Sequence, residues 1–175
     1  MHKIRLLPFL MAFVVLAMGH KTPKEEAQQD LHSYDISSYG VPITVMAPEG
    51  AEVSKSELGS MEFEGIKVIS VDIEKDMFIM NVSLTDVELE GETVSDLSEF
   101  YLETISEEPG FEIISQEDAG FIYKTEDPDI GLDYSFAYFM IKNNKEVYFT
   151  AGLSLFDNFK LEHVEAMFAA AKQAK

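Results

Sequence analysis

The stretch Leu132-Asp133-Tyr134-Ser135-Phe136-Ala137-Tyr138-Phe139-Met140-Ile141 decides the fold, because its apolar side chains serve two faces of one strand. Successive side chains of a β-strand point to opposite faces of the sheet. One face of this strand carries Leu132, Tyr134, Phe136, Tyr138 and Met140, and the other carries Ala137, Phe139 and Ile141. An antiparallel sheet needs one packed face, so a strand that is apolar on two faces predicts a central position between two covering layers.

Further strand patterns flank this stretch, and each is bounded by turn-forming residues. The turn Asn143-Asn144 suits a two-residue hairpin, because asparagine tolerates positive φ angles. The sequence predicts strands at Tyr39 to Met46, Met61 to Phe63, Lys67 to Glu74, Met77 to Thr85, Phe111 to Ser115, Phe121 to Thr125 and Val147 to Phe156. Most of these follow one another closely, which is typical of an antiparallel meander.

Two segments have a helical period instead. Thr93 can cap a helix whose buried face would carry Leu97, Phe100, Tyr101 and Ile105, and Pro109-Gly110 would end it. A second helix is predicted from Phe159 to Lys172, with Leu161, Val164, Phe168 and Ala171 on its buried face. We therefore predict an α+β protein: a three-layer α/β/α sandwich with two main helices around a mostly antiparallel sheet of about six to eight strands.

The N-terminus has the pattern of an export signal. Lys3 and Arg5 precede an apolar run from Leu6 to Met18, which is shorter than the roughly twenty residues of a membrane-spanning helix. Cleavage near Gly19 would leave a signal peptide at 1–19, a flexible polar tether at 20–35 and a single domain at 36–175; an uncleaved anchor is the alternative. We expect a periplasmic or cell-surface protein with no stable membrane insertion after cleavage.

The charge and cysteine content exclude several classes of function. Without residues 1–19 the chain holds eleven basic and thirty-two acidic residues, a net charge of −21. Such a charge repels nucleic acid and anionic lipid headgroups, so no nucleic-acid partner is expected. The chain has no cysteine, which excludes disulfides, zinc–thiolate sites and thiol nucleophiles.

The block Tyr39-Gly40-Val41-Pro42-Ile43-Thr44-Val45-Met46-Ala47-Pro48-Glu49-Gly50 resembles the opening of PsbP-like domains, an edge strand that ends in a Pro-x-Gly turn. The order of the predicted elements over residues 36–173 is similar to that superfamily, which includes the photosystem II extrinsic protein and a Ran-binding protein. Ala51 stands where the family often has tryptophan. The resemblance implies an α/β/α fold and an accessory or binding role, with no shared catalytic residue.

Two groups of residues are candidate binding sites. Carboxylates alternate around a glycine in Asp127-Pro128-Asp129-Ile130-Gly131-Leu132-Asp133, so Asp127, Asp129 and Asp133 could hold Ca²⁺. The loop lacks the distal bidentate glutamate of an EF-hand, and an ordinary hairpin turn explains the same residues. The stripe Tyr134, Phe136 and Tyr138 could line a ligand pocket or partner groove, although core packing explains strand spacing equally well.

Catalytic signatures are missing from the sequence. No GxSxG elbow, HExxH motif, phosphate loop or dinucleotide fingerprint occurs, and His163 is expected on the polar face of the last helix. We therefore predict a non-enzymatic exported accessory or binding protein whose partner is an envelope protein or a small ligand. The alternatives are a periplasmic binder of a small apolar ligand or calcium, and a hydrolase with a dispersed carboxylate site.

Overall fold

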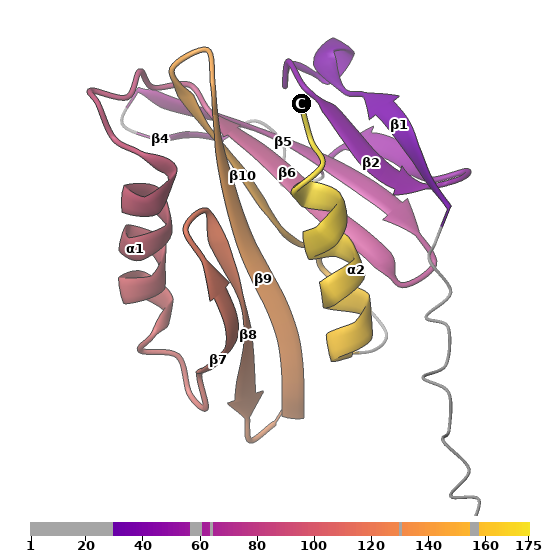
Figure 1. The fold of residues 1–175 in the computed structure, drawn as a ribbon, viewed down its shortest axis with the longest axis vertical. Coiled ribbons are helices and arrows are strands. Elements are labelled where there is room, and N and C mark those ends of the chain that lie inside the picture. The colour runs from indigo at the N-terminus through magenta and orange to yellow at the C-terminus, as the bar shows by residue number, and fades with distance from the viewer. Residues whose placement is uncertain (1–29, 57–60, 64, 130, 155–157) are drawn as a thin grey trace, which may run out of the picture.

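The structure, a computed structural model, describes residues 30–56, 61–63, 65–129, 131–154 and 158–175 (Figure 1). The predicted signal peptide and the predicted tether up to residue 29 lie outside the described residues. The last five residues of the predicted tether form a strand, β1 (Leu31–Asp35), instead. Leu31 and Tyr34 pack against the core, and the Tyr34 hydroxyl donates a 2.8 Å hydrogen bond to the Pro48 carbonyl. Two anchoring side chains thus order a segment whose other residues are polar.

β1 pairs antiparallel with β2 (Thr44–Pro48), and the two strands form a small ribbon that is separate from the main sheet. A 3₁₀ turn, η1 (Ser37–Tyr39), connects them. β2 begins five residues later than predicted, because Gly40 turns the chain at a φ of 102° and Pro42 has no N–H for a ladder hydrogen bond. Thr44 also exchanges two backbone hydrogen bonds of 3.0 Å with Lys175, which fastens the C-terminus beside β2.

The main sheet is antiparallel and runs in the order β3-β5-β6-β10-β9-β8-β7, with β4 pairing along the rest of the outer side of β5. Its strands are β3 (Glu52–Lys55), β4 (Met61–Phe63), β5 (Ile66–Lys75), β6 (Phe78–Thr85), β7 (Glu112–Glu117), β8 (Gly120–Asp127), β9 (Gly131–Lys142) and β10 (Lys145–Ala151). The predicted α+β class and mostly antiparallel sheet are confirmed. β3 was not predicted, since Val53 is its one large apolar residue.

β9 is buried from two sides. Phe136 on one face has no exposed surface, and Phe139 on the other is 3% exposed. The Phe136 ring meets the ring of Phe168 from the last helix at 5.9 Å, while the Phe139 ring lies 5.8 Å from Tyr101 of the first helix. The predicted central position of this strand is therefore correct. Leu132 is 43% exposed, because it lies near the start of the strand, beyond the helix that covers the centre.

Helix α1 (Val94–Ile105) begins at the predicted cap. The Thr93 hydroxyl accepts the Asp96 N–H at 3.3 Å, and the Asp96 carboxylate accepts the Thr93 N–H at 2.7 Å. Leu97, Tyr101 and Ile105 pack against β8 and β9 as predicted, but Phe100 is 73% exposed. Leu102 also faces this core cluster, which turns the buried stripe away from Phe100.

Helix α2 (Leu161–Ala171) packs on the other face of the main sheet, beside the β1–β2 ribbon (Figure 1). Val164, Met167, Phe168, Ala170 and Ala171 are buried there. The preceding strand β10 ends at Ala151 rather than at the predicted Phe156, and the Gly152 N–H bonds the Ile79 carbonyl at 2.8 Å. No helix in the described part of the chain is long and apolar enough to cross a membrane.

Because α1 covers one face of the sheet, removal of an aromatic ring beneath that helix should destabilise the folded state. Phe139→Ala is expected to lower the free energy of unfolding by about 3–5 kcal/mol, because it opens a cavity between β9 and α1. The matched change Phe100→Ala removes an exposed ring and should shift stability by less than about 0.5 kcal/mol. Urea denaturation followed by circular dichroism measures the difference, and equal effects of the two variants would contradict the assigned helix face.

Candidate functional site

The predicted aromatic stripe forms part of the core. Phe136 is fully buried, and the Tyr138 ring makes edge contacts with Phe149 and Phe168 at 5.7 and 5.9 Å. Tyr134 is partly buried against the same cluster. Burial raises the pKa of the Tyr138 phenol above its ordinary value. None of the three lines either of the two cavities described below, because α2 occupies the space above the stripe.

The predicted calcium ligands do not converge. The Asp127 carboxylate accepts the Asp129 N–H at 2.8 Å, which is an Asx turn within the β8–β9 hairpin. The Asp133 carboxylate accepts the backbone N–H of Phe159 at 2.8 Å and so fastens the segment before α2 to β9. Among the described residues, no group of three or more His, Cys, Asp or Glu could hold a metal ion. The Asp127 carboxylate thus stabilises the hairpin turn, and the Asp133 carboxylate stabilises the contact between β9 and the segment before α2.

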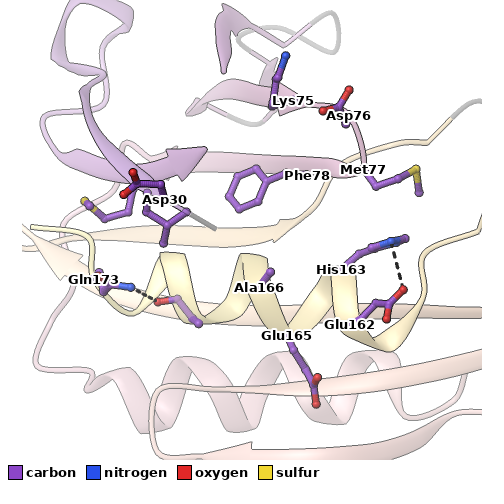
Figure 2. Close-up of a pocket in the computed structure, with 13 residues that line it drawn as sticks. Asp30, Lys75, Asp76, Met77, Phe78, Glu162, His163, Glu165, Ala166 and Gln173 are labelled. Atoms are coloured by element: carbon purple, nitrogen blue, oxygen red, sulfur yellow. Dashed lines mark hydrogen bonds and ion pairs between the residues drawn. The ribbon is translucent and has the colours of Figure 1, made fainter. Parts of the chain in front are cut away.

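A groove of about 900 Å³ runs along the outer side of α2 (Figure 2). We call it the α2 groove. One wall is α2, where the small residues Ala166 and Ala169 keep the helix surface low. Across from it lie the β5–β6 turn and residues of the β1–β2 ribbon. The groove is lined by Asp30, Leu31, Met46, Lys75, Asp76, Met77, Phe78, Glu162, His163, Glu165, Ala166, Ala169 and Gln173.

The α2 groove combines an apolar floor with an acidic rim. Met46, Met77 and Phe78 supply apolar surface opposite the two alanines, and Phe78 faces α2 across the groove (Figure 2). The charged lining residues are four carboxylates, one lysine and His163. The carboxylates belong to Asp30, Asp76, Glu162 and Glu165. Carboxylates of this kind lower the electrostatic energy of a nearby cation, and apolar side chains favour apolar contacts.

His163 lies in the α2 groove with both ring nitrogens directed at protein groups. Its Nδ1 accepts the Lys160 backbone N–H at 3.4 Å, and its Nε2 lies 3.8 Å from the Glu162 carboxylate. The side chain is 24% exposed. The prediction placed this histidine on a polar helix surface, and the structure places it at the edge of a groove. The sequence did not indicate the groove, since its walls come from four segments that are far apart in the chain.

A second cavity, of about 390 Å³, lies between the C-terminal part of α1 and the sheet, and we call it the α1 cavity. Two phenols line it, those of Tyr101 and Tyr123. Burial raises the pKa of Tyr123 to about 12, and nearby Tyr101 and Asp133 add to that increase. A hydrogen bond with Ser135 acts in the opposite direction. The neighbouring phenol of Tyr148 also has a pKa well above the ordinary value, again because it is buried.

Comparison of the chain with protein-family models, with curated proteins and with solved structures finds no match. The resemblance to PsbP-like domains therefore stays a prediction from the residues 39–50 and from the order of elements.

The role assigned to Asp133 can be separated from metal binding. Asp133→Ala should lower the free energy of unfolding by about 1–3 kcal/mol, because a charged acceptor for the Phe159 N–H is lost. Asp129→Ala, in the same hairpin but with an exposed side chain, should change it by less than about 0.5 kcal/mol. Thermal unfolding with calcium and with a chelator checks the assignment. A destabilisation by Asp133→Ala that appears only with calcium would favour the metal site instead.

The buried Tyr123 phenol predicts a loss of stability in alkali. The folded state holds this proton up to a pH of about 12, whereas an unfolded chain releases it near pH 10. The stabilisation is therefore present below about pH 10 and is lost as the pH rises toward 12, by about 2–3 kcal/mol for two pKa units. Urea midpoints across this range should fall less steeply in Tyr123→Phe. An identical alkaline slope in the variant and the wild type would refute this effect of burial.

Proposed function

We propose that this protein is an exported accessory domain of PsbP-like, three-layer architecture that binds a partner in the α2 groove and does not act as an enzyme. The export leader and the Tyr39 to Gly50 block support the first part of this proposal. The placement of α1 and α2 on opposite faces of an antiparallel sheet agrees with the layers that the resemblance implies. The second part of the proposal, the binding of a partner, rests on the α2 groove.

The chemistry of the groove favours a basic amphipathic segment of an envelope protein as the partner. Methionine side chains adapt to irregular apolar surfaces, so Met46 and Met77 suit apolar residues of different shapes. The acidic rim would meet lysine or arginine side chains between those apolar residues. The surrounding negative charge of the chain would speed the approach of a cationic partner and repel anionic ones.

The state of His163 supports binding rather than catalysis. A general base needs a ring nitrogen that can reach a substrate proton. In this groove one ring nitrogen accepts a backbone hydrogen bond from Lys160, and the other faces Glu162. The Asp76 carboxylate, on the opposite wall, is exposed to solvent. Such residues shape the rim of a binding groove and determine its charge.

Site-specific crosslinking in the source cells tests this function. A photo-crosslinking residue at Ala169, which is exposed in the groove, should give one discrete adduct with an envelope protein. The same residue at Thr104, which is exposed on α1, serves as the control. Mass spectrometry then identifies the crosslinked segment, which should contain an excess of lysine and arginine among apolar residues. No position-specific adduct, or an adduct with an acidic segment, would contradict the proposal.

A synthetic peptide of the captured segment gives the quantitative test. Glu165→Lys reverses a charge in the groove lining and should weaken binding about tenfold in fluorescence anisotropy, which corresponds to about 1.4 kcal/mol. Glu103→Lys makes the same change on an exposed face of α1 and should leave the affinity within about twofold. Equal effects of the two reversals would show that general attraction between opposite charges, rather than the groove, explains binding.

A further inference from the structure

The α1 cavity is a second concave site, on the opposite face of the sheet from the α2 groove. Its wall is formed by α1, by the strands β8, β9 and β10, and by the segment after β10. It is lined by Tyr101, Ile105, Glu108, Tyr123, Thr125, Asp133, Ser135, Thr150, Ala151, Gly152, Leu153 and Phe159. Its volume of about 390 Å³ lies near the lower end of the range for small-molecule sites, which suits one ring with its substituents.

Hydroxyl groups from separate elements meet in this cavity. Tyr101 comes from α1, Tyr123 from β8, Ser135 from β9 and Thr150 from β10. Tyr123 and Ser135 are direct cross-strand partners, so the register of the sheet places their side chains on the same face. Each hydroxyl can donate one hydrogen bond and accept others. The cavity therefore offers both donors and acceptors, beside the flat apolar faces of two aromatic rings.

A third phenol adds an independent observation. The Tyr148 ring lies 4.9 Å from the ring of Tyr101, and Tyr148 precedes the lining residue Thr150 by two positions on the same strand face. Its hydroxyl is buried and makes no hydrogen bond of good geometry among the described residues, although the Thr150 and Tyr101 hydroxyls lie near it. A buried hydroxyl without a well-formed hydrogen bond is uncommon in folded proteins. The phenol thus adds a third aromatic hydroxyl to the polar cluster beside the cavity.

The charges of the lining narrow the ligand class. Its charged residues are Glu108 and Asp133, with no lysine, arginine or histidine among the lining residues. Phosphates, carboxylates and sulfates would meet carboxylates with no compensating cation. A purely apolar ring would forgo hydrogen bonds with the lining hydroxyls, of which those of Tyr123 and Ser135 also bond each other. A neutral ligand that carries hydroxyl groups avoids both costs.

We propose that the α1 cavity binds a neutral, ring-shaped polyol the size of one monosaccharide. One face of a sugar ring consists of C–H groups and can stack on the rings of Tyr101 and Tyr123. Its hydroxyls both donate and accept hydrogen bonds, which matches Ser135 and Thr150, and the Asp133 carboxylate can accept from them. This site is separate from the α2 groove, so it holds or fails independently of the proposed function.

Saturation-transfer NMR tests the proposal with defined probes: glucose, galactose, N-acetylglucosamine and myo-inositol, with gluconate as an anionic comparison. At least one neutral probe should show saturation transfer, and gluconate should not. The protein has no tryptophan, so tyrosine emission gives an independent titration of the same binding. No transfer to any neutral probe, or stronger transfer to gluconate, would overturn the proposal.

Matched variants locate the binding. Thr150→Val replaces a lining hydroxyl with a methyl group of similar size and should weaken binding of the responding probe at least about tenfold. Tyr123→Phe removes a second lining hydroxyl and should have a similar effect, which covers the case in which the first variant does not fold. Thr104→Val, on the exposed face of α1, should bind like the wild type. Binding that survives in Thr150→Val and Tyr123→Phe would place the sugar elsewhere and refute the site.

Discussion

The burial of β9 from two sides is the constraint on which the rest of the structure depends. Phe136 and Phe139 are three residues apart, so they point to opposite faces of the sheet, and both are almost without exposed surface. Each ring therefore needs a separate element packed over it. α2 covers the first and α1 covers the second, so one strand determines the positions of both helices. The two cavities lie beside these helices, one on each face of the sheet.

The two faces of the main sheet differ in chemistry as well as in the helix that covers them. On the α2 side the sheet is covered by an apolar core that extends into the β1–β2 ribbon. On the α1 side the core is smaller, and polar pairs continue across the open part of the sheet: Ser70 with Ser83 at 2.8 Å, and Asn81 with Asp72 at 2.7 Å. The α2 groove, with its apolar floor, and the hydroxyl-lined α1 cavity follow this division. A cationic apolar partner and a neutral polar ligand would therefore meet different faces of one domain.

The features that the sequence predicts correctly are those that local chemistry determines. The alternation in β9, the Asn143-Asn144 turn with φ angles of 52° and 60°, and the Thr93 cap depend on residues close together in the chain. The failures depend on distant partners. β1 is a strand because Leu31 and Tyr34 find a core that other segments build, and Phe100 is exposed because α1 turns Leu102 inward.

The candidate sites could be predicted still less well, for the same reason. Asp127, Asp129 and Asp133 have the spacing of calcium ligands, but the Asp127 carboxylate accepts the Asp129 N–H and the Asp133 carboxylate accepts the Phe159 N–H. The tyrosines that reach a cavity are Tyr101 and Tyr123, whereas the stripe at Tyr134 to Tyr138 is covered by α2. The small residues Ala166 and Ala169 on the outer side of α2 do not by themselves indicate a groove. Whether such residues line a groove depends on which segments face the helix, and those segments are distant in the chain.

Native-state hydrogen exchange of the β9 amides tests the central claim most directly. If two helical layers protect this strand, the amides from Phe136 to Phe139 should exchange through global unfolding, with a free energy that matches the value from denaturant titration. Protection of this strand should also exceed that of the exposed edge strand β7. Exchange of the β9 amides through a local opening, at a free energy well below the global value, would contradict the account.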